Sequence, residues 1–274
     1  MSGSKSFLKS EKQKKLERIL LDETEGKKVV LAFSAGVDST ILLYIMRSLN
    51  IDVTAVTFDM GIADSSALCE KSKHLAEDCG ADYVLEKIDA MAIEAVRENR
   101  KDRCYFCKKA MFSRLRSIAE DIGASVVLDG TNADDLKEYR PGLRARDELR
   151  IKSPVAMAGI TKAELREIGK FMGLKAAGEP SSPCLLTRFP YNTHITPEMT
   201  DRVYRGEKIL HEVGFKDCRL RCHGSLARIE IPKDRFSDLN NSKDYIYEKI
   251  HNLGFDYVTL DLNGLRSGSM DIGE

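Results

Sequence analysis

The sequence lacks three features that would each point to a particular class of protein. It has no uninterrupted apolar run long enough to cross a bilayer, and its first fifteen residues are too polar for a secretion signal. It also has no excess of either charge, with 43 Lys and Arg against 43 Asp and Glu, whereas a nucleic-acid-binding protein usually carries a basic excess. We therefore expect a cytoplasmic protein that binds neither a membrane nor a nucleic acid.

The cysteines form neither a disulfide framework nor a zinc ribbon. Seven cysteines in a long chain without a secretion signal suggest thiols, a metal site or catalysis. Cys104 and Cys107 have Cys-x-x-Cys spacing, but no second pair of this kind completes a zinc ribbon. Cys184, in a Pro-Ser-Ser-Pro loop, is the natural third ligand. Three thiolates can hold a [4Fe–4S] cluster with one iron left open, and a zinc site with a fourth ligand such as His194 is the alternative.

The most informative stretch is an apolar run that ends in a turn of small residues. Residues 29–33 are β-branched and aromatic, as in a buried strand, and apolar residues follow at helical spacing from residue 41. The turn between them would direct backbone N–H groups at an anion from the start of a helix. The sequence therefore predicts a nucleotide phosphate site made of Ser34, Ala35, Gly36, Val37, Asp38 and Ser39.

Strands and helices continue to alternate after this unit. The apolar runs predict further strands at 53–59, 83–85 and 126–130, with helices between them, including one from about residue 89. This alternation predicts an α/β fold with a doubly wound parallel sheet, whose ligands lie beyond the carboxyl ends of the strands. The nucleotide-site candidates at those ends are Phe58, Asp59, Gly130, Thr131 and Asp134.

The polar groups after the last of these strands have simpler explanations as well. Asp and Asn residues in 129–135 are also typical of capped turns. Arg140, in the turn that follows, suits a phosphate or carboxylate of the substrate, and an exposed loop charge is the alternative. The position at the carboxyl edge of the sheet favours a site.

The pattern changes near residues 190–197, which predicts two domains. Residues 1–193 would form the nucleotide-binding domain, with a leader helix and the cysteine site, and residues 194–274 a small α/β domain for substrate phosphate binding and oligomerisation. Arg219 and Arg221 alternate with two cysteines along a predicted strand, so the two guanidinium groups would share one face. With His223 nearby they would clamp the substrate phosphate, and a solvated strand edge is the alternative.

Several of these motifs also resemble a known family. Ser-Ala-Gly-Val-Asp-Ser resembles the S-G-G-x-D-S loop of the PP-loop ATP pyrophosphatases, with Ala35 in place of the usual first glycine. Nearly the whole chain beyond residue 15 resembles the LarE family, the sulfur insertases that build the nickel-pincer nucleotide cofactor of lactate racemase. The motifs that carry this resemblance are the PP-loop, 129–135, 179–184, 188–191, 219–223 and 265–270.

The resemblance implies an enzyme that uses ATP and Mg²⁺ to adenylate a carboxylate of pyridinium-3,5-biscarboxylic acid mononucleotide. Sulfur from sulfide or another donor then displaces AMP and leaves a thiocarboxylate. Asp38, Cys184 and Arg188 would be catalytic, and the protein would be a homo-oligomer, a hexamer. Some members of the family sacrifice the cysteine that matches Cys184, whereas others carry three cysteines and a [4Fe–4S] cluster. Cys104 and Cys107 favour the cluster type.

Two other functions compete with this one. A PP-loop tRNA thiolase also pairs the loop with a three-cysteine cluster, but it would need a basic surface for RNA, which the balanced charge does not favour. A nucleotide sensor with a structural zinc is the second. An anaerobically purified cluster protein would be brown, and a zinc protein colourless.

Overall fold

The computed structural model describes residues 10–63, 65–138, 140–179, 183–266 and 268–270. The chain divides into two compact units. The first comprises Met1–Asp59, Ser66–Ile88 and Cys104–Ser181, and the second Met60–Ser65, Asp89–Arg103 and Ser182–Glu274. The second unit thus also includes residues on the amino-terminal side of position 193. The predicted functional division at that residue stays a prediction.

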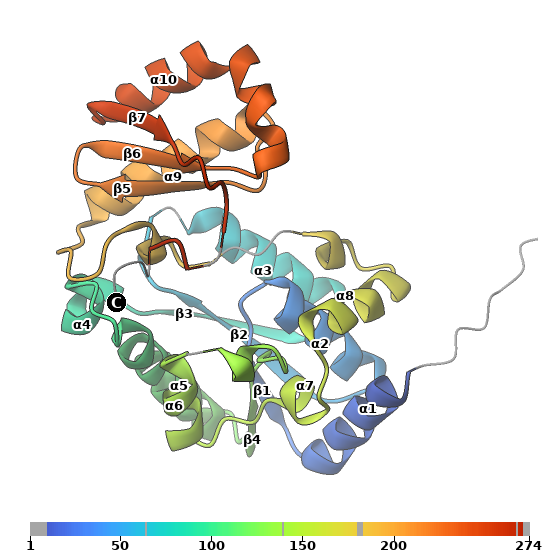
Figure 1. Cartoon of the computed structure of the whole chain (residues 1–274). Coiled ribbons are helices and arrows are strands. Elements are labelled where there is room, and N and C mark those ends of the chain that lie inside the picture. Colours follow the sequence, from blue (N-terminus) through green and yellow to red (C-terminus); the bar gives the residue numbers. More distant parts are fainter. Residues whose placement is uncertain (1–9, 64, 139, 180–182, 267, 271–274) are drawn as a thin grey trace, which may run out of the picture. The chain divides into compact units, whose positions relative to one another are not determined.

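The first unit is built on a parallel sheet of four strands flanked by helices (Figure 1). The strand order is β3-β2-β1-β4, and Val29 in β1 pairs with Val53 in β2 on one side and Val126 in β4 on the other. The predicted α/β class with a parallel sheet is confirmed. The strands are β1 (Val29–Ala32), β2 (Val53–Asp59), β3 (Asp82–Lys87) and β4 (Val126–Leu128).

Alternate side chains of the central strands face opposite sides of the sheet. Leu31 of β1 belongs to a buried apolar cluster to which the flanking helices contribute Leu16, Ile41 and Leu165, whereas the neighbouring Val30 is buried outside that cluster. The helices that bear on this unit are α1 (Glu11–Thr24), α2 (Val37–Ser48), α3 (Ser66–Asp78), α5 (Arg103–Asp121), α6 (Gly142–Glu148), α7 (Pro154–Met157) and α8 (Lys162–Phe171).

The second unit contains a three-stranded sheet with the order β5-β6-β7. β5 and β6 form a hairpin, which turns at Gly224 with a φ of +66°, and β7 runs parallel to β6. Its elements are α4 (Glu94–Arg97), α9 (Pro197–Glu212), β5 (Arg219–His223), β6 (Leu226–Glu230), α10 (Lys243–His251) and β7 (Tyr257–Leu260).

The prediction of one continuous helix from about residue 89 is wrong. The segment forms a 3₁₀ turn at Ala90–Ala92, and the single-turn helix α4 follows. Ile93, which lies between the two, has an extended backbone with φ −84° and ψ +107°. An apolar helical pattern therefore did not become one helix here.

None of the helices in the described part of the chain combines the length and the apolar character that crossing a bilayer requires.

Candidate active site

The predicted phosphate loop joins β1 to α2 and is folded by its own hydroxyl groups. The Ser39 hydroxyl accepts a hydrogen bond from the Ser34 N–H at 3.3 Å, and the Ser34 hydroxyl accepts one from the Gly36 N–H at 3.3 Å. Ala35 has a φ of +52°, in the left-handed region that favours glycine, which explains why the PP-loop motif usually has glycine there. The first amides of α2, which begins at Val37, have no acceptor within the helix and are therefore suited to bind an anion.

Asp38, in the first turn of α2, uses only one of its two carboxylate oxygens. Oδ2 accepts a hydrogen bond from Asn132 Nδ2 at 3.1 Å and lies 3.6 Å from Lys162 Nζ. Oδ1 is buried and has no hydrogen-bond partner among the described residues. A buried acceptor without a donor is costly, so such an oxygen is suited to a bound ligand. Carboxylate oxygen is also the ligand type that Mg²⁺ prefers, so the donor fits that ion.

Gly130 brings the exit of β4 against the start of α2. A Cβ at this position would lie 3.0 Å from Ser39 N and 3.1 Å from Ser39 Cα, so any larger residue would push the backbone of Ser39 away by a few tenths of an ångström. The neighbouring Asp129 is buried and accepts hydrogen bonds from the Thr131 hydroxyl at 2.7 Å and the Ser153 hydroxyl at 2.6 Å. The side chains of Asp129 and Thr131 therefore stabilise this turn, as the capped-turn alternative predicts. Gly130 lies against the phosphate loop.

Two residues beside Asp38 were missed as site residues. Asn132 is fully buried, and its Oδ1 accepts the N–H of Asp134 at 2.9 Å while its amide donates to Asp38. Its place in the polar 129–135 motif was the available signal. Lys162 lies far from Asp38 in sequence, and its local capping box pointed only to a helix start.

The predicted nucleotide ligand Asp134 has a structural contact in this arrangement. Its Oδ2 accepts the N–H of Lys162 at 3.0 Å and so fixes the start of α8. This backbone hydrogen bond and the nearby Lys137 lower the pKa of the Asp134 carboxyl. Phe58 is buried and Asp59 half-buried at the carboxyl end of β2.

Arg140 is exposed but already paired. Its Nη1 lies 2.6 Å from Asp135 Oδ1, and its Nη2 donates to Glu138 Oε2 at 2.8 Å. These partners belong to the same unit and hold the guanidinium at the surface. The predicted role in substrate binding stays a prediction.

The predicted cluster ligands divide between the two units. Cys104 and Cys107 lie three residues apart in the first turn of α5, so their side chains share one face of that helix. Cys184 is exposed and precedes the 3₁₀ turn Leu185–Arg188 of the second unit. Within the described ranges, no three His, Cys, Asp or Glu side chains gather as metal ligands. The three-cysteine set stays a prediction, as does the zinc alternative with His194, whose Nδ1 lies 2.8 Å from Glu98 Oε1.

Arg188 is buried in the second unit, where its side chain is only 2% exposed. It forms a two-point ion pair with Glu207, with distances of 2.7 Å from Nε to Oε1 and 3.1 Å from Nη2 to Oε2. Its Nη1 donates to the Thr187 hydroxyl at 2.8 Å and to the carbonyl oxygens of Pro183 and Cys184 at 3.3 and 3.4 Å. Arg188 thus fixes the backbone turn that presents Cys184.

The predicted arginine clamp contains a second buried ion pair. Arg221 donates to Glu230 Oε2 from Nε at 3.0 Å and from Nη2 at 2.8 Å, and its Nη1 donates to the Thr187 carbonyl at 2.9 Å. Glu230 is fully buried, and its Oε1 accepts from Arg228 at 3.1 Å and from Ser269 at 2.5 Å. A solvated strand edge is therefore wrong for Arg221. No pattern in the sequence pointed to its carboxylate partner.

Arg219 and His223 flank this pair on β5. Burial, and then the neighbouring Arg188, lower the pKa of the half-buried Arg219 guanidinium. Partial burial, and then the charges of Arg228 and Arg221, lower the pKa of His223, so its imidazole is mostly neutral near pH 7. Burial is the larger cause of both shifts, and the arginines around this face of β5 add to it.

The cysteines on either side of these arginines have a structural role. Cys218 and Cys222 are buried, and burial raises the pKa of both thiols, that of Cys218 to about 12. A thiol that stays protonated is a poor nucleophile and a poor metal ligand. These two cysteines therefore act as core residues.

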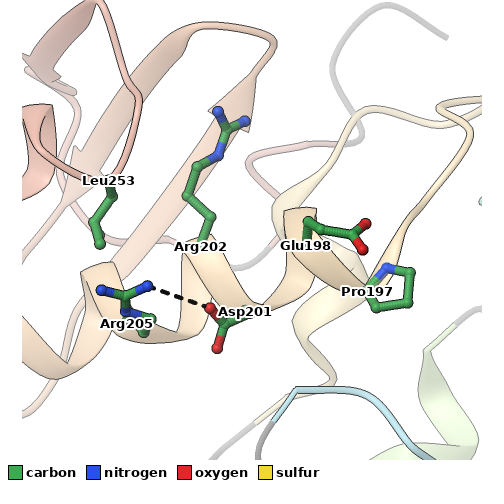
Figure 2. Close-up of a pocket in the computed structure, with 6 residues that line it drawn as sticks. All are labelled: Pro197, Glu198, Asp201, Arg202, Arg205 and Leu253. Carbon is green, nitrogen blue, oxygen red and sulfur yellow. Dashed lines mark ion pairs between the residues drawn. The ribbon is translucent and has the colours of Figure 1, made fainter.

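A surface hollow of about 480 Å³ lies at α9 in the second unit (Figure 2). It contains none of the predicted site residues. Asp201 and Arg205 form an ion pair of 3.6 Å along its edge, and Arg202 donates to the Gly224 carbonyl at 3.0 Å. The lining residues are Pro197, Glu198, Asp201, Arg202, Arg205 and Leu253.

Comparison with known proteins identifies the family. No family model matches the chain. The pyridinium-3,5-bisthiocarboxylic acid mononucleotide synthase of Lactiplantibacillus plantarum is 36% identical over 247 residues, which cover 89% of each chain. The chain belongs to the LarE family. An uncharacterized protein of Synechocystis is 35% identical over 266 residues, 94% of this chain and 97% of its own length.

A more distant relative of the LarE-family chain also transfers sulfur. The tRNA-specific 2-thiouridylase of Wolbachia pipientis is 25% identical over 207 residues, which cover 62% of this chain and 56% of the relative. The relatives and the parallel sheet confirm the predicted PP-loop fold, and the chain is an ATP-dependent sulfurtransferase of this class.

Proposed function

We propose that the protein adenylates a carboxylate of pyridinium-3,5-biscarboxylic acid mononucleotide and replaces it with a thiocarboxylate, for the nickel-pincer nucleotide cofactor. The similarity over 89% of both chains to a synthase named for the bisthiocarboxylic product carries this proposal. The phosphate loop with its half-satisfied Asp38 supports the ATP-dependent step. The basic face of β5 supports the choice of a phosphorylated substrate.

The phosphate loop would hold the ATP phosphates. In adenylation a carboxylate oxygen of the substrate attacks the α-phosphorus, the bond to the β-phosphate oxygen breaks, and pyrophosphate leaves. The first-turn amides of α2 would stabilise the departing charge without having to reorganise. Mg²⁺, when bound, would neutralise part of the phosphate charge, and Asp38 is the residue placed to hold it through Oδ1. Asn132 would keep the Asp38 carboxylate oriented.

The basic face of β5 would bind the phosphate of the mononucleotide. Arg188 and Arg221 are neutralised by buried carboxylates, so their main role would be to hold this face in shape and not to bind the phosphate. Arg219 and His223 are the more accessible groups, and an anion bound beside them would be attracted by the guanidinium of Arg219. Arg228, at 22% side-chain exposure, lies beside the same buried carboxylate and adds charge.

Three cysteines, of which Cys104 and Cys184 are exposed and Cys107 is partly buried, would deliver the sulfur. A [4Fe–4S] cluster held by Cys104, Cys107 and Cys184 would supply one open iron for a sulfur ligand. The hydrogen bonds from Arg188 to the carbonyl oxygens of Pro183 and Cys184 would keep Cys184 presented at the surface. A hydrosulfide then forms the C–S bond, the C–O bond to AMP breaks, and a proton is released as the thiocarboxylate forms. Oligomerisation through residues 194–274 and a cytoplasmic location belong to the same proposal.

The test starts with anaerobic reconstitution with iron and sulfide. The reconstituted protein is incubated with ATP, Mg²⁺ and the biscarboxylate mononucleotide, and pyrophosphate, AMP and the product mass are measured. We expect pyrophosphate release that depends on the mononucleotide, and a product in which sulfur has replaced oxygen. Release that depends on tRNA instead, with a salt-dependent tRNA shift, would contradict the proposal and favour a tRNA thiolase.

A further inference from the structure

The backbone of Lys162 is held by hydrogen bonds, whereas its ammonium group has only a long ion-pair contact. Its N–H donates to Asp134 Oδ2 at 3.0 Å, and the capping box between Thr161 and Glu164 sets the start of α8. Its ammonium group lies 3.6 Å from Asp38 Oδ2, which is longer than a hydrogen bond, and the side chain is 39% exposed. The backbone of Lys162 is therefore held in place, while its ammonium group is free to change position.

The ion-pair partner of Lys162 is Asp38, whose carboxylate has a hydrogen bond at only one of its two oxygens. Asn132 already donates to Oδ2, the oxygen nearer Lys162, and Oδ1 is buried with no partner within the described residues. The two charges thus lie close together at the first turn of α2, with no hydrogen bond between them. An ordinary ion pair between exposed side chains contributes little to stability and would not account for a buried unpartnered oxygen.

We propose that Lys162 is a polyphosphate-binding residue of the nucleotide site and that Asp38 holds its ammonium group before the nucleotide binds. When ATP binds, the ammonium turns to the β- and γ-phosphates and the carboxylate becomes available for the metal ion. The flexible four-carbon stem and compact charge of lysine suit such an exchange. This inference rests on the proposed use of ATP and adds a residue that the loop motif does not contain.

The test compares two lysines of the same helix. Lys162→Ala removes the proposed phosphate ligand, and Lys170→Ala removes an exposed lysine whose ion-pair partner is Glu167, at 2.7 Å. Calorimetry measures the affinity of each variant for α,β-methylene-ATP, which cannot release pyrophosphate, and for adenosine, which has no phosphate. We expect Lys162→Ala to weaken binding of the ATP analogue about tenfold and to leave adenosine unchanged, and Lys170→Ala to change neither.

Two results would overturn the inference. Affinity of Lys162→Ala for the analogue within about twofold of the parent would show that Lys162 does not bind phosphate. Equal weakening of the analogue and adenosine would show that the substitution only displaced the start of α8. Lys162→Gln, which keeps most of the stem and removes the charge, replaces the alanine variant if that variant does not fold.

The inference and the proposed function can fail separately. If the parent protein forms the thiocarboxylate and Lys162→Ala binds the analogue normally, only the role of Lys162 is lost. If the parent binds the analogue through Lys162 and makes no thiocarboxylate, only the proposed substrate is lost.

Discussion

Asp38 and Glu230 are two carboxylates in different units that are satisfied to different degrees. Asp38 accepts one hydrogen bond through Oδ2, and its buried Oδ1 has no partner among the described residues. Glu230 accepts four, two from Arg221, one from Arg228 and one from Ser269. A carboxylate with all its acceptor positions filled stabilises the fold, whereas one with a buried open oxygen is prepared for a ligand. The two carboxylates should therefore respond differently to the same substitution.

The largest expected effect is on catalysis, at Asp38. Asp38→Ala should lower pyrophosphate release by at least about 100-fold, because it removes the proposed metal ligand and the group that positions Lys162. Its melting temperature should stay close to that of the parent, since a buried unpartnered oxygen is removed as well. A pyrophosphate assay and a thermal melt measure the two effects. Release of AMP and pyrophosphate at the parent rate would show that the loop assignment is wrong.

Glu230 should show the opposite pattern, a loss of stability. Glu230→Ala leaves the Arg221 guanidinium, which is 6% exposed, without its partner, and should lower the free energy of unfolding by about 3–5 kcal/mol. Urea denaturation measures this change. The double variant Glu230→Leu with Arg221→Met should recover part of the loss, because the buried Arg221 charge is removed together with its partner. A loss below about 1 kcal/mol in the single variant would mean that the pair is hydrated in solution.

The sequence could predict the parts of the site whose residues are close together in the chain. It could not predict contacts between residues that are far apart in the chain. The strand, loop and helix around Asp38 are adjacent in sequence, and Gly130 follows an apolar run, so their meeting at the carboxyl edge of the sheet was predictable. Lys162 lies 3.6 Å from Asp38 but far away along the chain, and its capping box explained it locally. No sequence pattern joined the two.

The buried ion pairs were equally beyond a sequence pattern. Arg188 was expected to be catalytic from the family resemblance, and Arg221 to bind phosphate from its place on a predicted strand. Both are buried against carboxylates. Glu207 and Glu230 have the pattern of ordinary polar residues of a helix and a strand, and only tertiary packing shows that they are enclosed. The sequence motifs singled out these two arginines of the second unit. They did not show whether the arginines bind a ligand or stabilise the fold.

A smaller effect, on nucleotide affinity, is expected from the close contact between Gly130 and Ser39 beside Asp38. Gly130→Ala would place a methyl group 3.0 Å from Ser39 N, so the loop must shift and affinity for α,β-methylene-ATP should fall about tenfold. Gly178→Ala is the matched control, because a Cβ added there would have no atom within 4 Å. Equal affinities of the two variants would show that Gly130 does not shape the nucleotide site.

The smallest effect concerns pH and the anchor of Lys162. The Glu164 pKa is lowered from 4.5 to about 2, first by Lys12 and then by the Thr161 N–H. Because the folded pKa lies below the unfolded one, this stabilisation is present above about pH 4.5 and is lost as pH falls toward 2. Glu164→Gln keeps the cap and removes the charge, so it should cost about 0.5–1 kcal/mol near neutral pH and nothing at the acid limit. A difference independent of pH in urea titrations would exclude this origin.

The most direct test of sulfur insertion through a cluster is the intact mass of the protein after turnover. Reconstituted protein is supplied with sulfide, ATP and the biscarboxylate mononucleotide, and both the thiocarboxylate formed per chain and the mass of the chain are measured. We expect several products per chain and an unchanged mass, with Cys184 retained. One product per chain, together with a mass lower by one H₂S at Cys184, would mean that the cysteine itself is the sulfur donor and would contradict the cluster mechanism.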